Sequence, residues 1–319
     1  MKAIVITTIS SKPTEALRLF AKIKGYSLIL VGDVKSPKKY NLNCTYLPID
    51  TQHKIDAQLS KELPLNHYAR KNIGYVYAIK AGAELIAESD DDNLPYETWG
   101  SSQKTICTSV ITEPELPNIY KLFTNKKIWP RGFPVEKINI NEPIKTTRES
   151  VEIGVWQSLA DGDPDVDALY RLILGESVIF EKEKDVALGQ NSFCAFNSQN
   201  TLWFPKSFTY MYLPSTVTFR YTDILRSYVA QFGLRARGLN IGFTKATCFQ
   251  ERNKHSLIQD LKSELPMYSS TLEVISLLKS IHLTGQDSDI LIMYKALVNS
   301  GIVHADELNL VESWLNAIS

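Results

Sequence analysis

The sequence predicts an α/β protein built on a mostly parallel, twisted sheet flanked by helices, and two features of the chain support this. Short apolar runs, "AIVITT" from Ala3, "SLILVGD" from Ser27 and "AELIAES" from Ala83, are typical of strands buried on both faces. Segments with apolar residues at helical spacing lie between these runs. Alternating strands and helices form parallel sheets with right-handed crossovers, so we expect this topology in the first third of the chain.

Capping residues bound the two predicted helices of this region. The first, "TEALRLFAKIK", follows Pro13, with Ser10 or Ser11 as its N-cap, and Gly25 ends it. The second, "LNHYARKNIGYVYAIKAG", ends at Gly82, where a C′ glycine belongs. Both boundaries agree with the strands predicted on either side.

For the remaining two thirds of the chain, secondary structure is predicted from composition and from the spacing of apolar residues. The region 99–200 is rich in aromatic residues and prolines, so we expect irregular loops and a few mixed strands. An amphipathic helix follows, with an apolar face from Ile224 to Phe232. From about His255 the pattern is helical to the last residue. We therefore expect one sheet domain, residues 1–254, and a C-terminal helical appendage, residues 255–319.

Overall composition excludes several classes of protein. The chain has 319 residues with 35 basic and 35 acidic side chains, and this zero balance argues against a nucleic-acid partner. No apolar stretch is long enough for a transmembrane segment or a signal sequence, which leaves open an association with a membrane surface. The four cysteines show no C-x-x-C spacing. We expect a soluble, reduced, cytoplasmic protein of unknown oligomeric state.

Three adjacent acids, Asp90, Asp91 and Asp92, end the third predicted strand. Two carboxylates about 5 Å apart repel by roughly 3 kcal/mol at an effective dielectric constant of ~20. A solvated acidic turn would explain such a triplet. However, the carboxyl ends of parallel strands are where ligands bind in open sheets. We therefore expect Asp90 and Asp92 to hold Mn²⁺ or Mg²⁺, which completes its coordination with phosphate oxygens of a substrate.

Polar residues follow the other two strands at the same edge of the sheet. Thr7, Thr8 and Asp33 are placed to bind the base and ribose of a nucleotide, although Asp33 could simply cap a turn. On the helix before the acids, Arg70 and Lys71 could bind phosphate or ribose, or could be solvated helix residues.

Two further residues of this helix, Asn72 and Gly74, would let the helix approach the nucleotide closely. Helix packing would explain the glycine equally well. The motifs of other nucleotide-binding and hydrolytic sites are absent: there is no G-x-x-x-x-G-K-[ST], G-x-G-x-x-G, G-x-S-x-G or H-E-x-x-H.

Five segments then occur in a specific order: "ARKNIGYVYAIKAGAELIAESDDDN", "IWPRGFP", "DPDVDALYRL", "FNSQNTLW" and "FRYTDILRSYVAQ". Together they resemble the STELLO-type glycosyltransferases and, more distantly, the reversibly glycosylated polypeptides that act as UDP-arabinopyranose mutases. The resemblance covers roughly residues 1–250 and not the tail. It implies a GT-A-like fold and a transferase that moves a sugar from a nucleotide-diphosphate sugar, which we expect to be UDP-linked, to a glycan or lipid-linked glycan acceptor.

The resemblance also implies roles for single residues. It assigns Asp90, Asp91 and Asp92 to the metal and the diphosphate, and it places Arg131 near the donor sugar. It places Asp223 close to the reaction centre, where the carboxylate would be the catalytic base; a helix N-terminal acid would look the same in the sequence.

Other residues and other functions stay open. Trp129 and Trp203 could stack on sugars or lie in the core, and the acids Asp163, Asp165 and Asp167 could bind a sugar or lie in a solvated loop. Two functions compete with transfer: a nucleotide-sugar mutase, and a non-catalytic nucleotide-sugar-binding scaffold.

Overall fold

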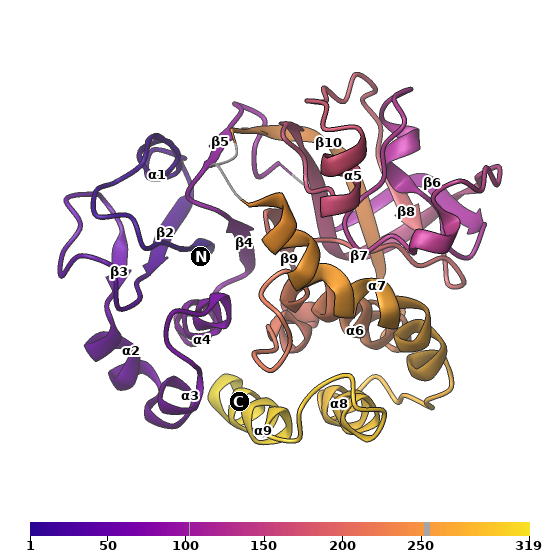
Figure 1. Ribbon diagram of the computed structural model, residues 1–319. Helices are drawn as coiled ribbons and strands as arrows, with labels where there is room; N and C mark the ends of the chain where they lie inside the picture. The colour runs from indigo at the N-terminus through magenta and orange to yellow at the C-terminus, as the bar shows by residue number, and fades with distance from the viewer. Residues whose placement is uncertain (102, 252–255) are drawn as a thin grey trace.

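The computed structural model describes residues 1–101, 103–251 and 256–319, and within these ranges ten strands form a single sheet in the order β3-β2-β1-β4-β9-β7-β6-β8-β10-β5 (Figure 1). The strands are β1 (Lys2–Thr7), β2 (Tyr26–Val31), β3 (Thr45–Leu47), β4 (Leu85–Ser89), β5 (Asn93–Pro95), β6 (Thr105–Glu113), β7 (Lys145–Gly162), β8 (Val186–Leu188), β9 (Asn200–Trp203) and β10 (Asn240–Gln250). The helices are α1 (Glu15–Phe20), α2 (Ile49–Ile55), α3 (Ala57–Glu62), α4 (Lys71–Lys80), α5 (Ala168–Ile173), α6 (Thr222–Ala236), α7 (Leu257–Lys279), α8 (Asp289–Asn299) and α9 (Glu307–Ile318), with short 3₁₀ turns η1 (Tyr68–Arg70), η2 (Ile119–Leu122), η3 (Val135–Lys137) and η4 (Pro205–Met211).

The N-terminal part of the sheet has the predicted parallel topology. Strands β3, β2, β1 and β4 lie side by side and parallel, with Ile4 opposite both Leu28 and Ala87. These strands are buried on both faces because α4 packs on one face and α1 on the other (Figure 1). The α/β class that the sequence predicts is therefore confirmed.

The second half of the sheet, from β9 to β5, contains both parallel and antiparallel pairs. Fewer of its strands could be predicted from the sequence. Strand β9 joins the halves and runs antiparallel to both β4 and β7. Strand β7 has 18 residues, and its first half, "KTTRESVE", is polar and mostly exposed, so the sequence pattern there is that of a loop. Strand β10, parallel to β7, was also missed.

Local capping corrects two helix boundaries. The N-cap of α1 is Thr14, whose side chain accepts a hydrogen bond from the backbone N–H of Leu17, so neither Ser10 nor Ser11 caps this helix. Helix α4 begins at Lys71, later than predicted, because the chain before it forms the 3₁₀ turn η1. The predicted C′ glycine is confirmed: Gly82 has φ +74°.

The C-terminal helices are confirmed, but they share the core with the sheet. Helix α7 is continuous through Pro266. Trp314 of α9 is fully buried, packs edge-on against Tyr75 of α4 and donates a hydrogen bond from its indole to the carbonyl of Thr209 at 2.9 Å. The predicted boundary between residues 254 and 255 lies outside the described residues and stays a prediction. Within the described ranges, the helices are too short or too polar to cross a membrane.

Candidate active site

A cavity of about 440 Å³ opens at the carboxyl ends of β1, β2 and β4. The cavity brings together nine of the ten site residues predicted from the sequence and leaves out Asn72. The described residues that line it are Thr7, Thr8, Ile9, Val31, Gly32, Asp33, Lys35, Asn66, His67, Tyr68, Arg70, Asp90, Asp91, Asp92, Arg131, Asp165, Ser198, Gln199, Phe219, Arg220, Asp223 and Gln250.

The three acids after β4 each meet a different environment. Asp90 accepts a hydrogen bond from the Tyr68 hydroxyl at 2.8 Å and lies 3.4 Å from the ammonium of Lys71, with 31% of its side chain still exposed. Asp91 accepts a hydrogen bond from the Thr8 hydroxyl. Asp92 meets only the amide of Gln250, at 3.4 Å, through Oδ2. Its Oδ1 is buried and has no hydrogen-bond partner in the part of the chain that the structure describes.

This environment disfavours a negative charge on Asp92. Burial, followed by the neighbouring charges of Asp90 and Asp91, raises the pKa of Asp92 to about 7. Burial also raises the pKa of Asp90, but Lys71 and Tyr68 counteract it. A positive ion beside Asp92 would therefore relieve an unfavourable arrangement that the protein leaves uncompensated.

The charge balance and the donor set fit a divalent ion bound together with an anion. Six aspartates and four basic residues line the cavity, a formal balance of −2 with His67 neutral, and Lys71 lies just behind the lining. No group of three or more acidic, histidine or cysteine side chains in the described ranges is arranged to hold a metal. Mg²⁺ and Mn²⁺ commonly need only one or two carboxylates when phosphate oxygens and water complete the shell, so Asp90 and Asp92 fit this kind of site.

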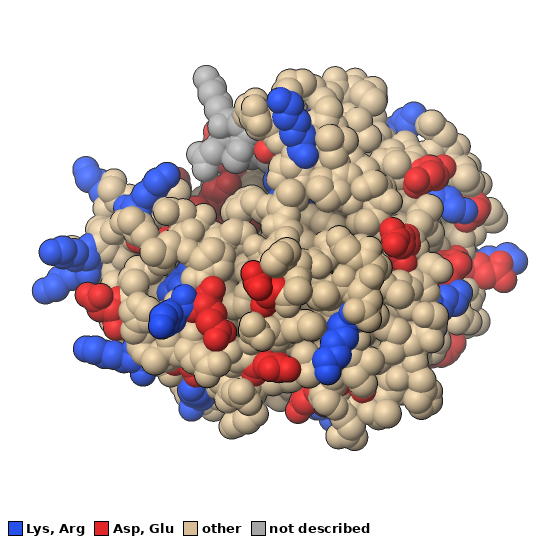
Figure 2. Space-filling view, turned by 60° about the horizontal axis from the view of Figure 1, so that its bottom comes forward, with Lys and Arg blue, Asp and Glu red and all other residues tan. Residues whose placement is uncertain are grey.

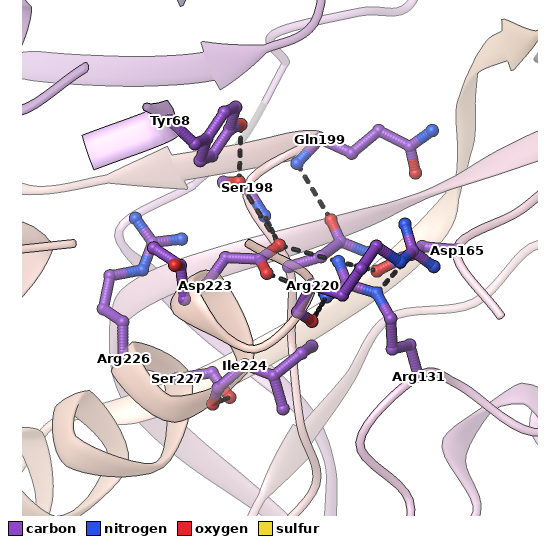
Figure 3. Close-up of polar contacts among 12 residues, drawn as sticks. Tyr68, Arg131, Asp165, Ser198, Gln199, Arg220, Asp223, Ile224, Arg226 and Ser227 are labelled. Atoms are coloured by element: carbon purple, nitrogen blue, oxygen red, sulfur yellow. Dashed lines mark hydrogen bonds and ion pairs between the residues drawn. The ribbon is translucent and has the colours of Figure 1, made fainter. Parts of the chain in front are cut away.

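A second cluster lies at the first turn of α6 and is built on Arg131 (Figure 3). Arg131 donates to both oxygens of Asp165, at 2.8 and 2.9 Å, and to both oxygens of Asp223, at 2.9 and 2.9 Å. Its fifth N–H bonds to the carbonyl of Arg220. All five donors of Arg131 are thus occupied, so the side chain organises the cavity wall and has no free donor for a ligand.

The same cluster fixes the charge of Asp223. Although burial acts to raise its pKa, the adjacent Arg131 guanidinium lowers it to about 2, with help from Arg226 and Arg220. Asp223 is therefore ionised at every physiological pH. It also accepts hydrogen bonds at 3.3 Å from the backbone N–H and the hydroxyl of Ser198. A carboxylate with so low a pKa is a weak proton acceptor at rest, so as a catalytic base it would take a proton only while the new bond forms and the acceptor hydroxyl becomes more acidic.

Sequence reasoning missed the hydroxyl residues that join the two clusters. The Tyr68 hydroxyl lies between Asp90 and Ser198, 2.7 Å from the latter's Oγ, and Ser198 contacts Asp223 (Figure 3). Gln250 likewise joins Asp92 to Gln199. Ser198 and Gln199 lie in the segment "FNSQNTLW", which was noted only as part of the resemblance.

Two predicted nucleotide-binding residues have structural roles in this conformation. Arg70 is buried, and its five donors are bonded to Gln52, Ser60 and the carbonyl of Leu63, so it ties the segment before α4 to α2 and α3. Asn72 faces away from the cavity and exchanges two hydrogen bonds of 2.9 Å with the backbone of Leu213.

The glycine of the same helix also serves packing. A Cβ on Gly74 would come within 2.5 Å of Val5 and 2.6 Å of Val31, so Gly74 lets α4 pack closely on the sheet. The predicted polar residues at the strand ends, by contrast, do line the cavity. Asp33 accepts a hydrogen bond from the backbone N–H of Val34 at 2.7 Å and another from that of His67 at 3.2 Å.

The two tryptophans lie in the core, and the acids Asp163, Asp165 and Asp167 have different environments. Trp129 donates to Asp167, the N-cap of α5, at 2.7 Å, and Trp203 donates to the buried Glu88 at 3.0 Å. Asp163 forms an ion pair with Arg171. Of these three acids, Asp165 is the one that lines the cavity.

Comparison with known proteins confirms the resemblance seen in the motifs. The family model of the STELLO glycosyltransferases matches residues 220–319. The match therefore includes the tail helices, which the motifs alone left outside the resemblance. "Probable glycosyltransferase STELLO2" of Arabidopsis thaliana is 30% identical over 250 residues, and "Probable glycosyltransferase STELLO1" of the same plant is 28% identical over 250 residues. Each alignment covers 71% of this chain.

The chain spans about a third of the length of these curated relatives, 33% and 32% respectively. Among solved structures, the glucosyl-3-phosphoglycerate synthase of Mycobacterium tuberculosis in complex with phosphoglyceric acid is similar, with a TM-score of 0.39 and 8% identity. That alignment covers 86% of this chain and 78% of the synthase chain.

Proposed function

We propose that this protein is a metal-dependent glycosyltransferase that transfers a sugar from a nucleotide-diphosphate sugar, UDP-linked in our assignment, to a hydroxyl of a glycan or lipid-linked glycan. The observation that carries the proposal is the buried Oδ1 of Asp92, which lies among three carboxylates at a strand end and has no hydrogen-bond partner among the described residues. Similarity to the STELLO glycosyltransferases supports the same reaction class. We also keep the prediction that the protein acts in the cytoplasm.

The donor would enter at the carboxyl ends of β1 and β2. In this assignment Thr7, Thr8 and Asp33 bind the nucleoside, and Asp90 and Asp92 hold Mg²⁺ or Mn²⁺ against the diphosphate. The ion would neutralise the charge that develops on the leaving nucleoside diphosphate. Asp91, held by Thr8, would keep the acidic turn in position.

Asp223 would act on the acceptor. In the transfer, the acceptor oxygen bonds to the anomeric carbon, the bond from that carbon to the phosphate oxygen breaks, and the acceptor hydroxyl loses its proton. Because Asp223 is ionised, it can accept a hydrogen bond from that hydroxyl and take the proton as the new bond forms. Arg131 would hold this carboxylate in place through its bidentate contact.

The test is calorimetric titration of the protein with UDP, with Mn²⁺ present or with excess EDTA. We expect measurable affinity only with the metal, and equal affinity in EDTA would overturn the metal assignment. Incubation with nucleotide sugars and candidate acceptors then identifies the reaction. Acceptor-dependent release of nucleotide indicates a transferase, an isomerised donor indicates a mutase, and binding without turnover indicates a scaffold.

A further inference from the structure

Most of the basic side chains around the cavity already form hydrogen bonds with other groups of the protein. The guanidinium groups of Arg131 and Arg70 have all five N–H groups bonded to described residues. The Lys71 ammonium lies within 3.4 Å of the Tyr68 hydroxyl, the carbonyls of Ser89 and Ser198, and Asp90. An anionic ligand would therefore find few donors among the cations that line this cavity.

Arg220 differs from these residues. Its Nε donates to Oε1 of Glu264 at 2.9 Å. Its Nη2 is buried and forms an ion pair with the same oxygen at 2.7 Å, and it makes no hydrogen bond to the described residues. Its Nη1 makes no hydrogen bond to the described residues. The side chain is 14% exposed and lines the cavity beside Asp223 and Asp165 (Figure 3).

The partner of Arg220 is held firmly by the tail. Glu264 lies on α7, is fully buried, and its second oxygen accepts hydrogen bonds from the backbone N–H of Ala168 at 2.7 Å and the Tyr268 hydroxyl at 2.5 Å. The backbone of Arg220 is fixed as well, because its carbonyl accepts from Arg131. The guanidinium is thus anchored on the edge formed by Nε and Nη2, and Nη1 has no acceptor among the residues that the structure describes.

We propose that Arg220 binds a phosphate oxygen of the ligand in the cavity, and that Glu264 is the positioning residue that orients it from the tail helix. The N–H groups of Nη1 are the ones left unused, and a charged guanidinium N–H is a strong donor to a phosphate oxygen. This inference rests on the proposed function in taking the anion to be the diphosphate of the donor. A phosphate group on the acceptor has the same chemistry and is the second source to be tested.

The experiment compares variants for binding of uridine, UMP, UDP and inorganic pyrophosphate, each with Mn²⁺, by calorimetry. The variants are Arg220→Met, Arg220→Lys and Glu264→Gln. The double variant Arg220→Met with Glu264→Gln avoids leaving a buried carboxylate without its partner. Lys35→Met, which removes an exposed charge at the same cavity, is the matched control for long-range electrostatics.

We expect Arg220→Met to weaken UDP binding by roughly 10- to 100-fold, the loss typical of a hydrogen bond to a charged group. Uridine affinity should stay unchanged, which also shows that the variant is folded. Arg220→Lys should retain part of the UDP affinity, and Glu264→Gln should lose part of it. Lys35→Met should cost less than Arg220→Met. A merely structural ion pair would lower thermal stability without changing the ratio of UDP to uridine affinity.

The outcomes separate this inference from the function on which it rests. If the wild type binds UDP in a metal-dependent manner and Arg220→Met leaves the affinities for UDP and pyrophosphate unchanged, the inference is wrong and the proposed function stands. If the wild type binds pyrophosphate through Arg220 but does not bind UDP, the anion site stands and the donor assignment falls. If Arg220→Met weakens pyrophosphate binding only in a complex already saturated with UDP, the anion belongs to the acceptor.

Discussion

Replacing Asp92 by asparagine should stabilise the metal-free protein while removing its response to metal. The carboxylate is held in a site where its pKa is about 7 instead of 3.8, so the folded state binds a proton more tightly than the unfolded state does. The stabilisation that this proton provides is complete below about pH 4 and is lost as the pH rises through 7. At about pH 8 the folded wild type therefore carries the full cost of an ionised Asp92, which the asparagine variant does not have.

The size of the effect follows from the shift. The rise of the Asp92 pKa from 3.8 to about 7 corresponds to a change in the free energy of unfolding of at most ~4 kcal/mol. Asp92 is partly exposed, so solvent screening reduces this to about 1–2 kcal/mol. For a chain of this size, that gain raises the melting temperature by roughly 1.5–3 °C. Near pH 4, where Asp92 is protonated in the folded wild type, the two proteins should differ much less.

The assay is thermal unfolding at about pH 4 and pH 8, with EDTA or with Mn²⁺ and UDP. Asp50→Asn, which removes an exposed carboxylate on α2, is the control for the change in net charge. We expect Asp92→Asn to melt higher than wild type at pH 8 in EDTA and to show no further rise with Mn²⁺ and UDP. Destabilisation at pH 8, or a metal response equal to that of the wild type, would refute the reasoning.

Three further substitutions probe the site and its support. Asp223→Asn should lower turnover by about 10²-fold or more while UDP affinity is kept, and near-normal steady-state rates would remove Asp223 from the chemistry. Asn72→Ala should cost about 2–4 kcal/mol in urea unfolding, because two backbone groups of Leu213 lose their partners; a large loss of UDP affinity in the folded variant would instead restore Asn72 to the nucleotide site. Glu88→Gln should cost about 3–5 kcal/mol in the same assay because it leaves the buried Arg226 without its counter-charge, and a change below about 1 kcal/mol would contradict this.

The part of the site that the sequence revealed is the part set by local rules. Parallel strands end at one edge of a sheet, so Thr8, Asp33 and the acids after β4 could be placed together from the strand pattern alone. The cluster around Arg131 could not be placed in this way. Its partners Asp165 and Asp223 lie 34 and 92 residues away, and tertiary packing decides which carboxylate meets which guanidinium.

The orientations of Arg70 and Asn72, which the sequence could not predict, have a physical cause as well. Arg70 and Asn72 precede the acidic strand and carry groups suited to phosphate and ribose, but residue type does not determine which way a helix is rotated against its sheet. The close approach at Gly74 sets that rotation and turns Asn72 toward Leu213. Hydroxyl residues such as Tyr68 and Ser198 have no spacing signal, so the bridge between the two clusters was visible only in three dimensions.

The contact between α9 and the N-terminal helices determines when this protein can complete its core during synthesis. Gln58 bonds to Ser313 across 255 residues of chain, and the Trp314 indole covers Tyr75. On the ribosome, β1, β2 and α4 emerge long before these partners are made, so an apolar face stays uncovered until α9 has emerged. Contacts so distant in sequence also slow folding. The nascent chain should therefore depend on chaperones until α9 has been released.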